Sequence, residues 1–370
     1  MVIRSLGSAL FIAIFLATTH RVNGANPLPR GTPEAQGIST NAINDYVEAL
    51  DKIDAIHSFM VVRHGQVIAE GWWKPEAADK PHVLNSVSKS FNSTAVGMAV
   101  TEGKLSLDDH VLKFFPADAP ADPSDNLKSM TVRDLLTMSG GHDTEPKPVD
   151  GSPSVKQFLN SPVVHQPGTH FLYNGMGSYT LSAIVTKVTG QTVGEYLKPR
   201  LFEPLGIENA DWPSSPEGFS LGAHGLYLRT EDIAKLGQLY LQKGRWNGKQ
   251  LIPETWVQDA TSKHVENDKE PHANIGIDWH QGYGYQFWRC THNAFRGDGA
   301  GGQFVVVLPD QDVVVAMTAG GANMQAELDA IWEKLLPAFQ DKALPEDAAA
   351  QGKFKQVVAK LEVRSAKKDK

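Results

Sequence analysis

Strand-like segments lie near both ends of this chain of 370 residues, and its middle contains few of them. Residues 58–62 and 66–71 form one candidate pair of strands, and residues 303–308 and 313–318 form a second pair; residues 283–289 are a further candidate. Each pair is joined by a short turn, which implies antiparallel pairing. We therefore predict one antiparallel sheet that is built from both ends of the chain.

Helix patterns and loops fill the block from about residue 80 to residue 221. Helices are also expected at residues 41–53 and 324–336, where apolar residues recur on one face. These patterns predict an α+β fold: an antiparallel sheet with flanking helices, and an inserted, mostly helical lobe. The expected boundaries are residues 25–79 and 222–343 for the α/β lobe, and residues 80–221 for the helical lobe.

The two ends of the chain have compositions of their own. Arg4 precedes an apolar run at residues 6–17, and small residues follow it, which is typical of a signal peptide at residues 1–24. The run is too short for a comfortable membrane span, and an uncleaved anchor is the alternative. We expect an exported protein, periplasmic or extracellular, with no stable membrane span after cleavage. Residues 344–370 are polar and lysine-rich at their end, and we predict a mobile tail there.

Composition argues against several classes of function. The formal net charge of −7 gives no general case for nucleic-acid binding. Cys290 is the only cysteine, so no intrachain disulfide is possible, and burial is its expected role. The 13 histidines include no His-Glu-x-x-His sequence and no close pair of ligands. We therefore predict no metal ligands and no cofactor.

Ser86 and Lys89 stand at the start of a helix-compatible run. Residues three apart lie on the same helix face, so the Ser86 hydroxyl and the Lys89 amine are within reach of each other. A serine hydroxyl is a weak nucleophile unless a base takes its proton, and a lysine that loses its charge on burial can be that base. The pattern alone is common, and an exposed polar turn is the alternative interpretation.

Five segments occur together in a fixed order, and their combination is far more specific than any one of them. They are Ser86-Val87-Ser88-Lys89, TVRDLLTMSG at 131–140, PGTHFLY at 167–173, GLYLRTEDIAKLG at 225–237 and GAGGQFVVVLP at 299–309. With them the chain resembles the serine β-lactamase and penicillin-binding-protein superfamily over residues 30 to 340. It is most similar to the class C β-lactamase-like branch, which holds esterases, D-stereospecific peptidases and 6-aminohexanoate-dimer hydrolases. The resemblance implies a site between the sheet and the helical lobe.

The resemblance also implies roles for individual residues. Ser86 matches the acylated nucleophile, Lys89 its general base and Tyr173 a second acid/base beside the lysine. We expect the lysine ammonium to lower the pKa of the Tyr173 phenol; a core aromatic residue with a hydrogen-bonded hydroxyl is the alternative. Gly299 would let substrate approach the strand edge. The backbone N–H groups of Ser86 and Ala300 would form the oxyanion hole.

Two motifs depart from the family pattern. Gly175 stands where the second motif has asparagine, and Asn174 is the adjacent source of an amide for substrate binding. Gly297-Asp298-Gly299 aligns with the third motif without its cation, which removes a contact to a substrate carboxylate of roughly 1.5–3 kcal/mol. Arg296 is adjacent, but it points to the opposite face of a strand unless the register shifts. Asp298 has either a structural role or a substrate contact.

We therefore expect a serine hydrolase, carboxylesterase-like or amidase-like, that forms an acyl-enzyme on Ser86. The missing cation at Gly297 favours esters or neutral amides as substrates. One alternative is a D-alanyl carboxypeptidase or penicillin-binding protein, or a weak β-lactamase. Another is a non-catalytic binder on the same fold. The expected partner is a small-molecule ester, amide or peptide substrate.

Overall fold

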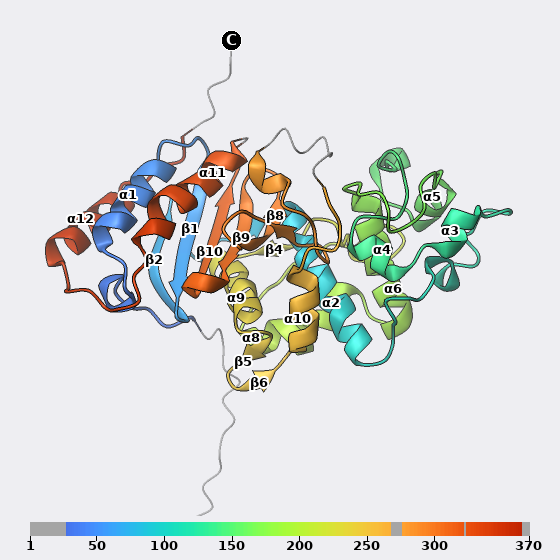
Figure 1. The fold of residues 1–370 in the computed structure, drawn as a ribbon, viewed down its shortest axis with the longest axis horizontal. Coiled ribbons are helices and arrows are strands. Elements are labelled where there is room, and N and C mark those ends of the chain that lie inside the picture. The colour runs from blue at the N-terminus through green and yellow to red at the C-terminus, as the bar shows by residue number, and fades with distance from the viewer. Residues whose placement is uncertain (1–26, 268–275, 322, 365–370) are drawn as a thin grey trace, which may run out of the picture.

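The structure is a computed structural model that describes residues 27–267, 276–321 and 323–364. Its central feature is a six-stranded sheet with the order β2-β1-β10-β9-β8-β7 (Figure 1). The strands are β1 (Ile56–Arg63), β2 (Gln66–Trp72), β7 (Trp288–Arg289), β8 (Phe295–Gly299), β9 (Gln303–Leu308) and β10 (Val313–Ala319). Every pairing is antiparallel. The predicted α+β fold, with a sheet from both ends of the chain, is confirmed.

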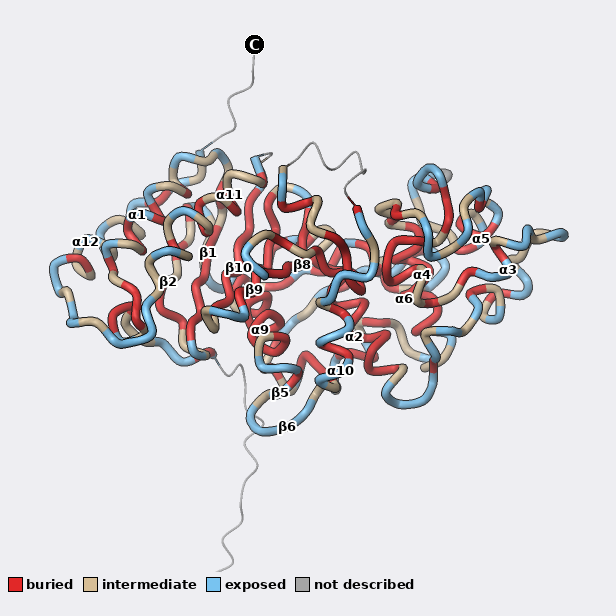
Figure 2. Tube along the Cα trace, in the orientation of Figure 1, coloured by how far each residue is buried: buried red, intermediate tan, exposed pale blue. Residues whose placement is uncertain are grey.

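Strand β10 joins the two ends of the chain, because it pairs with β1 from Ile56↔Ala319 to Arg63↔Val313. Its alternate residues enter two different hydrophobic clusters. Val314 packs in the cluster that includes α9 (Thr230–Leu241), and Val315 packs in the cluster that includes α1 (Thr40–Leu50). Successive side chains of a strand point to opposite faces, so both faces of the sheet are covered. This double burial explains the nearly continuous apolar runs of β9 and β10 (Figure 2).

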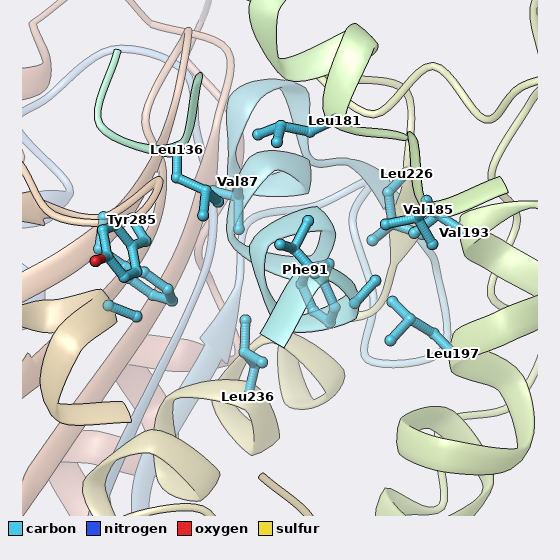
Figure 3. Packing of buried hydrophobic residues seen from close by; sticks show 14 of the residues in the cluster. Val87, Phe91, Leu136, Leu181, Val185, Val193, Leu197, Leu226, Leu236 and Tyr285 are labelled. Carbon is cyan, nitrogen blue, oxygen red and sulfur yellow. The ribbon is translucent and has the colours of Figure 1, made fainter. Parts of the chain in front are cut away.

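Helix α2 (Ser88–Thr101) is buried along most of its length between the sheet and the helical part of the molecule. Its main helical neighbour is α6 (Gly175–Thr189). Figure 3 shows Phe91 of α2 surrounded by apolar side chains that include Leu236 of α9 and Leu181 of α6. The helix is enclosed on all sides, so its polar side chains lie inside the protein. Those of Lys89, Ser90 and Thr94 are hydrogen-bonded there, whereas Ser93 Oγ has no hydrogen-bond partner among the described residues.

The strand predicted at residues 283–289 was wrong over most of its length, because only Trp288–Arg289 form β7. Tyr283 makes isolated bridges, and the backbone between them turns. Gln286 has a φ of 62°, which no strand residue adopts. Gly284 lies so close to the Ala260 carbonyl oxygen that an added Cβ would be 2.2 Å from it. The segment is therefore shaped by its neighbours rather than by sheet pairing.

The C-terminal segment predicted as a mobile tail contains a helix that the sequence analysis did not expect, α12 (Ala348–Val358), and its mobility stays a prediction. The Asp347 side chain caps the helix by accepting from the Ala350 N–H. Phe354, Val357 and Val358 pack against the cluster that includes α1. These three apolar residues stand among lysines and glutamines, so the sequence gives only a weak signal for a helix here. The helix is stabilised by packing against the cluster that includes α1.

Two further predictions concern the signal peptide at the N-terminus and the boundaries of the two lobes. The predicted signal peptide at residues 1–24 lies outside the described residues. Within the parts of the chain that the structure describes, no helix is long and apolar enough to cross a bilayer. The expected lobe boundaries at residues 80 and 221 stay predictions.

Helix α9 approaches the sheet through Gly237, and this contact yields a test of the packing. A Cβ at Gly237 would lie 2.5 Å from the Val314 side chain and 2.6 Å from that of Val305. We expect Gly237→Ala to lower the free energy of unfolding, because overpacking costs about 1–3 kcal/mol and exceeds the gain in helix propensity of about 1 kcal/mol. Chemical denaturation measures the change.

The matched control for Gly237→Ala is Gly352→Ala in α12, where nothing lies within 4 Å of the added Cβ. This substitution gains helix propensity without a clash, so it should raise stability by up to about 1 kcal/mol. Equal effects of the two substitutions would contradict the close contact between α9 and the sheet.

Candidate active site

Ser86 lies in a single turn, Asn85–Val87, directly before α2. The short strands β3 (His82–Val83) and β4 (Tyr227–Leu228) pair with each other, and the Leu84 N–H donates to the Leu226 carbonyl at 2.8 Å. On the other side, the Asn85 side-chain amide donates to the Ala300 carbonyl at 2.7 Å. Contacts from two distant parts of the chain therefore fix the turn that presents the half-buried Ser86 side chain.

Lys89 is the lysine of the site, and it is buried, with an exposed fraction of 3%. Its Nζ lies 2.9 Å from Ser86 Oγ and donates to the Ala223 carbonyl at 2.8 Å. Burial lowers the Lys89 pKa to about 7, while the negative charges of Glu145 and Asp298 act to raise it. A large share of the molecules therefore carries a neutral amine beside the Ser86 hydroxyl at neutral pH.

Tyr173 lies against the same pair, with Lys89 Nζ 4.8 Å from the centre of its ring. The ring stacks on Trp288, with centroids 5.4 Å apart, and a side-chain hydrogen bond links Tyr173 to Ser86. The predicted lowering of the Tyr173 pKa was wrong. Burial raises the pKa well above its usual range, and the hydrogen bond from Ser86 only partly opposes this. The phenol is therefore protonated throughout the neutral range.

The end of β8 meets the serine turn at Gly299, and the predicted approach of substrate to this strand edge stays a prediction. A Cβ on Gly299 would lie 2.4 Å from the Leu84 carbonyl oxygen and 3.1 Å from the Ser86 nitrogen, so only glycine allows this approach. Ala300 follows Gly299 and is held through its carbonyl by Asn85. The assignment of the Ser86 and Ala300 N–H groups to an oxyanion hole stays a prediction.

The structure explains why no cation occupies the third motif. A Cβ on Gly297 would lie 2.9 Å from both Ser90 Oγ and a Val305 methyl group, so the position has no room for a lysine side chain. The pairing of β8 with β9 is regular from Phe295 to Gly299, so no register shift turns Arg296 toward Ser86. The missing cation is thus not replaced from the neighbouring position.

Arg296 and Asp298 form a buried ion pair on the other face of β8, with Nε 2.9 Å from Oδ2. The Arg296 guanidinium also lies over the Trp279 ring at 4.3 Å and donates to the Asp278 carbonyl. Asp298 therefore has a structural role as the partner of Arg296. Its charge still reaches Lys89, whose pKa it helps to raise.

Asn174 caps a helix through its side-chain oxygen, and its role in substrate binding stays a prediction. Its Oδ1 accepts from the Gly177 N–H at 2.9 Å at the start of α6, and the residue is 6% exposed. The Gly175 N–H instead donates to Glu145 Oε1 at 2.7 Å. A Cβ on Gly175 would lie 3.1 Å from the same oxygen, so Glu145 occupies the space beside the absent side chain.

No sequence motif marks Glu145, which lies in a proline-rich loop. Its carboxylate raises the pKa of both Lys89 and Tyr173, which places its charge close to the reacting groups. Glu145 also lines a cavity of about 410 Å³ together with Gly175, Ala223 and His224. The Ala223 carbonyl binds Lys89, so one residue of the cavity lining contacts the serine–lysine pair, while Ser86 and Lys89 are not themselves in that lining. Three larger cavities, near Trp246, Trp212 and Cys290, are lined by none of these four residues.

Comparison with known proteins identifies relatives of the whole fold. The family model described as Beta-lactamase matches residues 44–337. The chain is 23% identical to a putative D-alanyl-D-alanine carboxypeptidase of Escherichia coli K12, over 68% of this chain and 75% of that protein. It is 25% identical to the 6-aminohexanoate-dimer hydrolase of Paenarthrobacter ureafaciens, over 70% of this chain and 71% of that protein. The solved structure of a putative 6-aminohexanoate-dimer hydrolase from Bacillus anthracis superposes on this structure with a TM-score of 0.64 at 20% sequence identity. The superposition covers 83% of this chain and 85% of that one.

The depressed pKa of Lys89 predicts a specific dependence of stability on pH. The unfolded lysine has a pKa near 10.5 and the folded one about 7, so between these values the unfolded state binds more protons. Stability from this group therefore rises as pH increases from about 7 to 10.5, and it is lost as pH falls through about 7. Lys89→Met removes the effect.

The measurement is the free energy of unfolding of the wild type minus that of Lys89→Met, taken from pH 6 to 10. The subtraction cancels the other titrating groups. The difference should move in favour of the wild type as pH rises across this range. A difference that does not change with pH would mean that Lys89 titrates normally in the folded protein.

Proposed function

The chain belongs to the beta-lactamase family, and on this premise we propose that it is a serine hydrolase that forms an acyl-enzyme on Ser86 and acts on esters or neutral amides. The observation that carries the proposal is the 2.9 Å contact between Lys89 Nζ and Ser86 Oγ. With a pKa of about 7, Lys89 can serve as a base at neutral pH. Several relatives are named as hydrolases or esterases, which supports the same class of reaction.

The proposed reaction begins when the neutral amine of Lys89 accepts the Ser86 proton. Ser86 Oγ attacks the substrate carbonyl carbon, and the negative oxygen of the tetrahedral intermediate rests on the N–H groups of Ser86 and Ala300. When the bond to the leaving group breaks, Tyr173 donates a proton to that group and recovers one from the Lys89 ammonium. Water then attacks the acyl-enzyme, with the same groups moving the proton in the opposite sense.

The raised pKa of Tyr173 supports the role of an acid for this residue. A phenol that holds its proton throughout the neutral range is not a phenolate base in the resting enzyme. Lys89 is then the group that starts the reaction, and Tyr173 passes its proton on. The division of roles follows from burial, which favours the neutral form of both side chains.

The charges around the site support neutral substrates. Gly297 leaves no cation for a substrate carboxylate, and Arg296 is engaged with Asp298 on the other face of β8. Glu145 adds a negative charge beside the cavity next to Lys89. An anionic substrate would therefore lack the ion pair of the family pattern, and it would be repelled by the negative charge of Glu145.

A D-alanyl carboxypeptidase or penicillin-binding protein is the second candidate, because a relative bears the name of a putative D-alanyl-D-alanine carboxypeptidase. Slow release of a fluorescent penicillin from Ser86 would favour it. The grouping of Ser86, Lys89 and Tyr173 argues against a non-catalytic binder. We also propose export from the cell, on the basis of residues 1–24.

Replacing Ser86 tests the nucleophile. Ser86→Ala should lower turnover of a p-nitrophenyl ester by more than about 10³-fold, because the acyl group has no oxygen to bind. Intact-mass analysis of the wild type after a fluorophosphonate probe should show one adduct, which peptide sequencing maps to Ser86. The control is Ser90→Ala, whose hydroxyl donates to the Gln286 carbonyl and not to Lys89. Undiminished turnover by Ser86→Ala would refute the mechanism.

The pH profile tests the base. We expect kcat/KM to rise with pH through about 7, because Lys89 acts only when it has lost its proton. Glu145→Gln removes a charge that raises the Lys89 pKa, so it should move the rise to lower pH. Glu266→Gln is the control, since Glu266 is exposed and pairs with Lys263. An unchanged profile in Glu145→Gln would show that this carboxylate does not act on the base.

Competition between substrates tests the preference for neutral molecules. Short p-nitrophenyl esters should have a kcat/KM at least roughly tenfold above that of nitrocefin, since the missing contact to a carboxylate is worth about 1.5–3 kcal/mol. Both substrates are followed by absorbance with the same enzyme preparation. Faster hydrolysis of nitrocefin would overturn the preference while leaving the serine mechanism intact.

A further inference from the structure

Two histidines and one carboxylate meet on the helical part of the molecule, away from Ser86 and Lys89 in sequence. They are Asp143, His165 and His170, and their potential ligand atoms all lie within 4.8 Å of one another. His165 Nε2 lies 3.1 Å from Asp143 Oδ1, and the two imidazole rings have centroids 4.1 Å apart. Asp143 is exposed and the histidines are half-buried, so the group is open to solvent on one side.

The backbone holds these side chains in place before any ligand arrives. His142 bridges Val163, and the His165 N–H donates to the Gly141 carbonyl at 2.9 Å. Further along, the Gly168 N–H donates to the Ser139 carbonyl at 2.8 Å. Two segments that are far apart in the sequence therefore run side by side, with Asp143 on one and both histidines on the other.

Gly141 is needed for this approach of the two segments. Its φ is 89°, and an added Cβ would lie 2.4 Å from the His165 carbonyl oxygen. A residue with a side chain would push the segments apart and separate Asp143 from His165. The cluster thus rests on local backbone geometry rather than on chance contacts between long side chains.

We propose that Asp143, His165 and His170 bind a transition-metal dication such as Zn²⁺, with solvent completing the coordination. Two imidazoles and a carboxylate form a donor set that suits zinc and its neighbours, whereas Mg²⁺ and Ca²⁺ prefer oxygen ligands. Zinc–ligand distances of about 2.0–2.1 Å place tetrahedral ligands roughly 3.3 Å apart. The 3.1 Å separation of His165 and Asp143 already fits, and the widest pair closes by side-chain rotation.

A bound ion would connect two segments that lead into the proposed active site. Glu145 follows Asp143 by two residues, and Tyr173 follows His170 by three. A metal that clamps Asp143 to the histidines therefore restrains both the carboxylate beside Lys89 and the phenol beside Ser86. None of the three ligands takes part in the hydrolysis proposed above, so metal binding and hydrolysis are independent proposals.

Calorimetry tests the site directly. The mature protein, without an affinity tag, is treated with a chelator that is then removed, and ZnCl₂ is titrated in a buffer that does not bind zinc. We expect saturable binding of one ion and a higher melting temperature with zinc, because the ligands are held together only in the folded state. MgCl₂ and CaCl₂ should give neither effect. X-ray absorption of the complex should show two imidazole nitrogens.

Variants locate the ion. His165→Ala and His170→Ala should each weaken zinc binding by more than about 100-fold, and Asp143→Asn by about tenfold or more. His110→Ala, an exposed histidine in the same helical part of the chain, is the control and should bind as the wild type does. If His170→Ala fails to fold by circular dichroism, His170→Gln replaces it. Absence of one-to-one binding, or binding that survives both alanine substitutions, would show an ordinary surface ion pair and overturn the proposal.

Discussion

The site depends on a lysine that is buried without a carboxylate in direct contact. Lys89 Nζ has the Ser86 hydroxyl and the Ala223 carbonyl as its hydrogen-bond partners, and both are neutral. A charged amine in such surroundings is costly, and the lysine responds by releasing its proton more easily. Direct contact with Glu145 or Asp298 would have fixed the charge and removed the base. These carboxylates instead lie near enough to raise the pKa of the amine without forming an ion pair with it.

The packing of α2 makes this arrangement possible. The helix is enclosed by α6, α9 and the sheet, so Lys89 cannot turn toward solvent (Figure 3). Gly222 brings the Ala223 carbonyl to the lysine through a φ of 66°, and an added Cβ there would lie 2.6 Å from Ser182. The chemistry proposed at Ser86 therefore rests on apolar packing and on a glycine more than thirty residues from any catalytic candidate in sequence.

Sequence patterns predicted those features that arise from local periodicity or from motifs in a fixed order. The antiparallel sheet followed from paired strands at both ends, and the contact of Ser86 with Lys89 followed from their spacing at the start of a helix. The remaining features depend on contacts between distant segments. Glu145 reaches Gly175 from a loop, and α12 is stabilised by docking on α1.

The pKa of Tyr173 shows the same limit of sequence reasoning in electrostatic terms. Its expected direction came from one neighbour, the lysine ammonium, whereas the observed direction comes from burial against Trp288 and other rings. The pKa of Lys89 is itself lowered, so its positive charge is weakened as a cause that could lower the pKa of the phenol. Burial favours the neutral form of each group, and the degree of burial cannot be read from their spacing in the sequence.

Burial also raises the pKa of a carboxyl group beside the turn that follows β8. Glu327 is fully buried, and neither of its side-chain oxygens has a hydrogen-bond partner among the described residues. An added Cβ on Gly302 would lie 2.3 Å from Glu327 Oε1, so the carboxyl lies directly against the turn that carries Ala300. Burial, with the charge of Asp298, raises the Glu327 pKa well above its usual range. The raised pKa favours the uncharged form of this carboxyl group, which fills the space beneath the turn that carries Ala300.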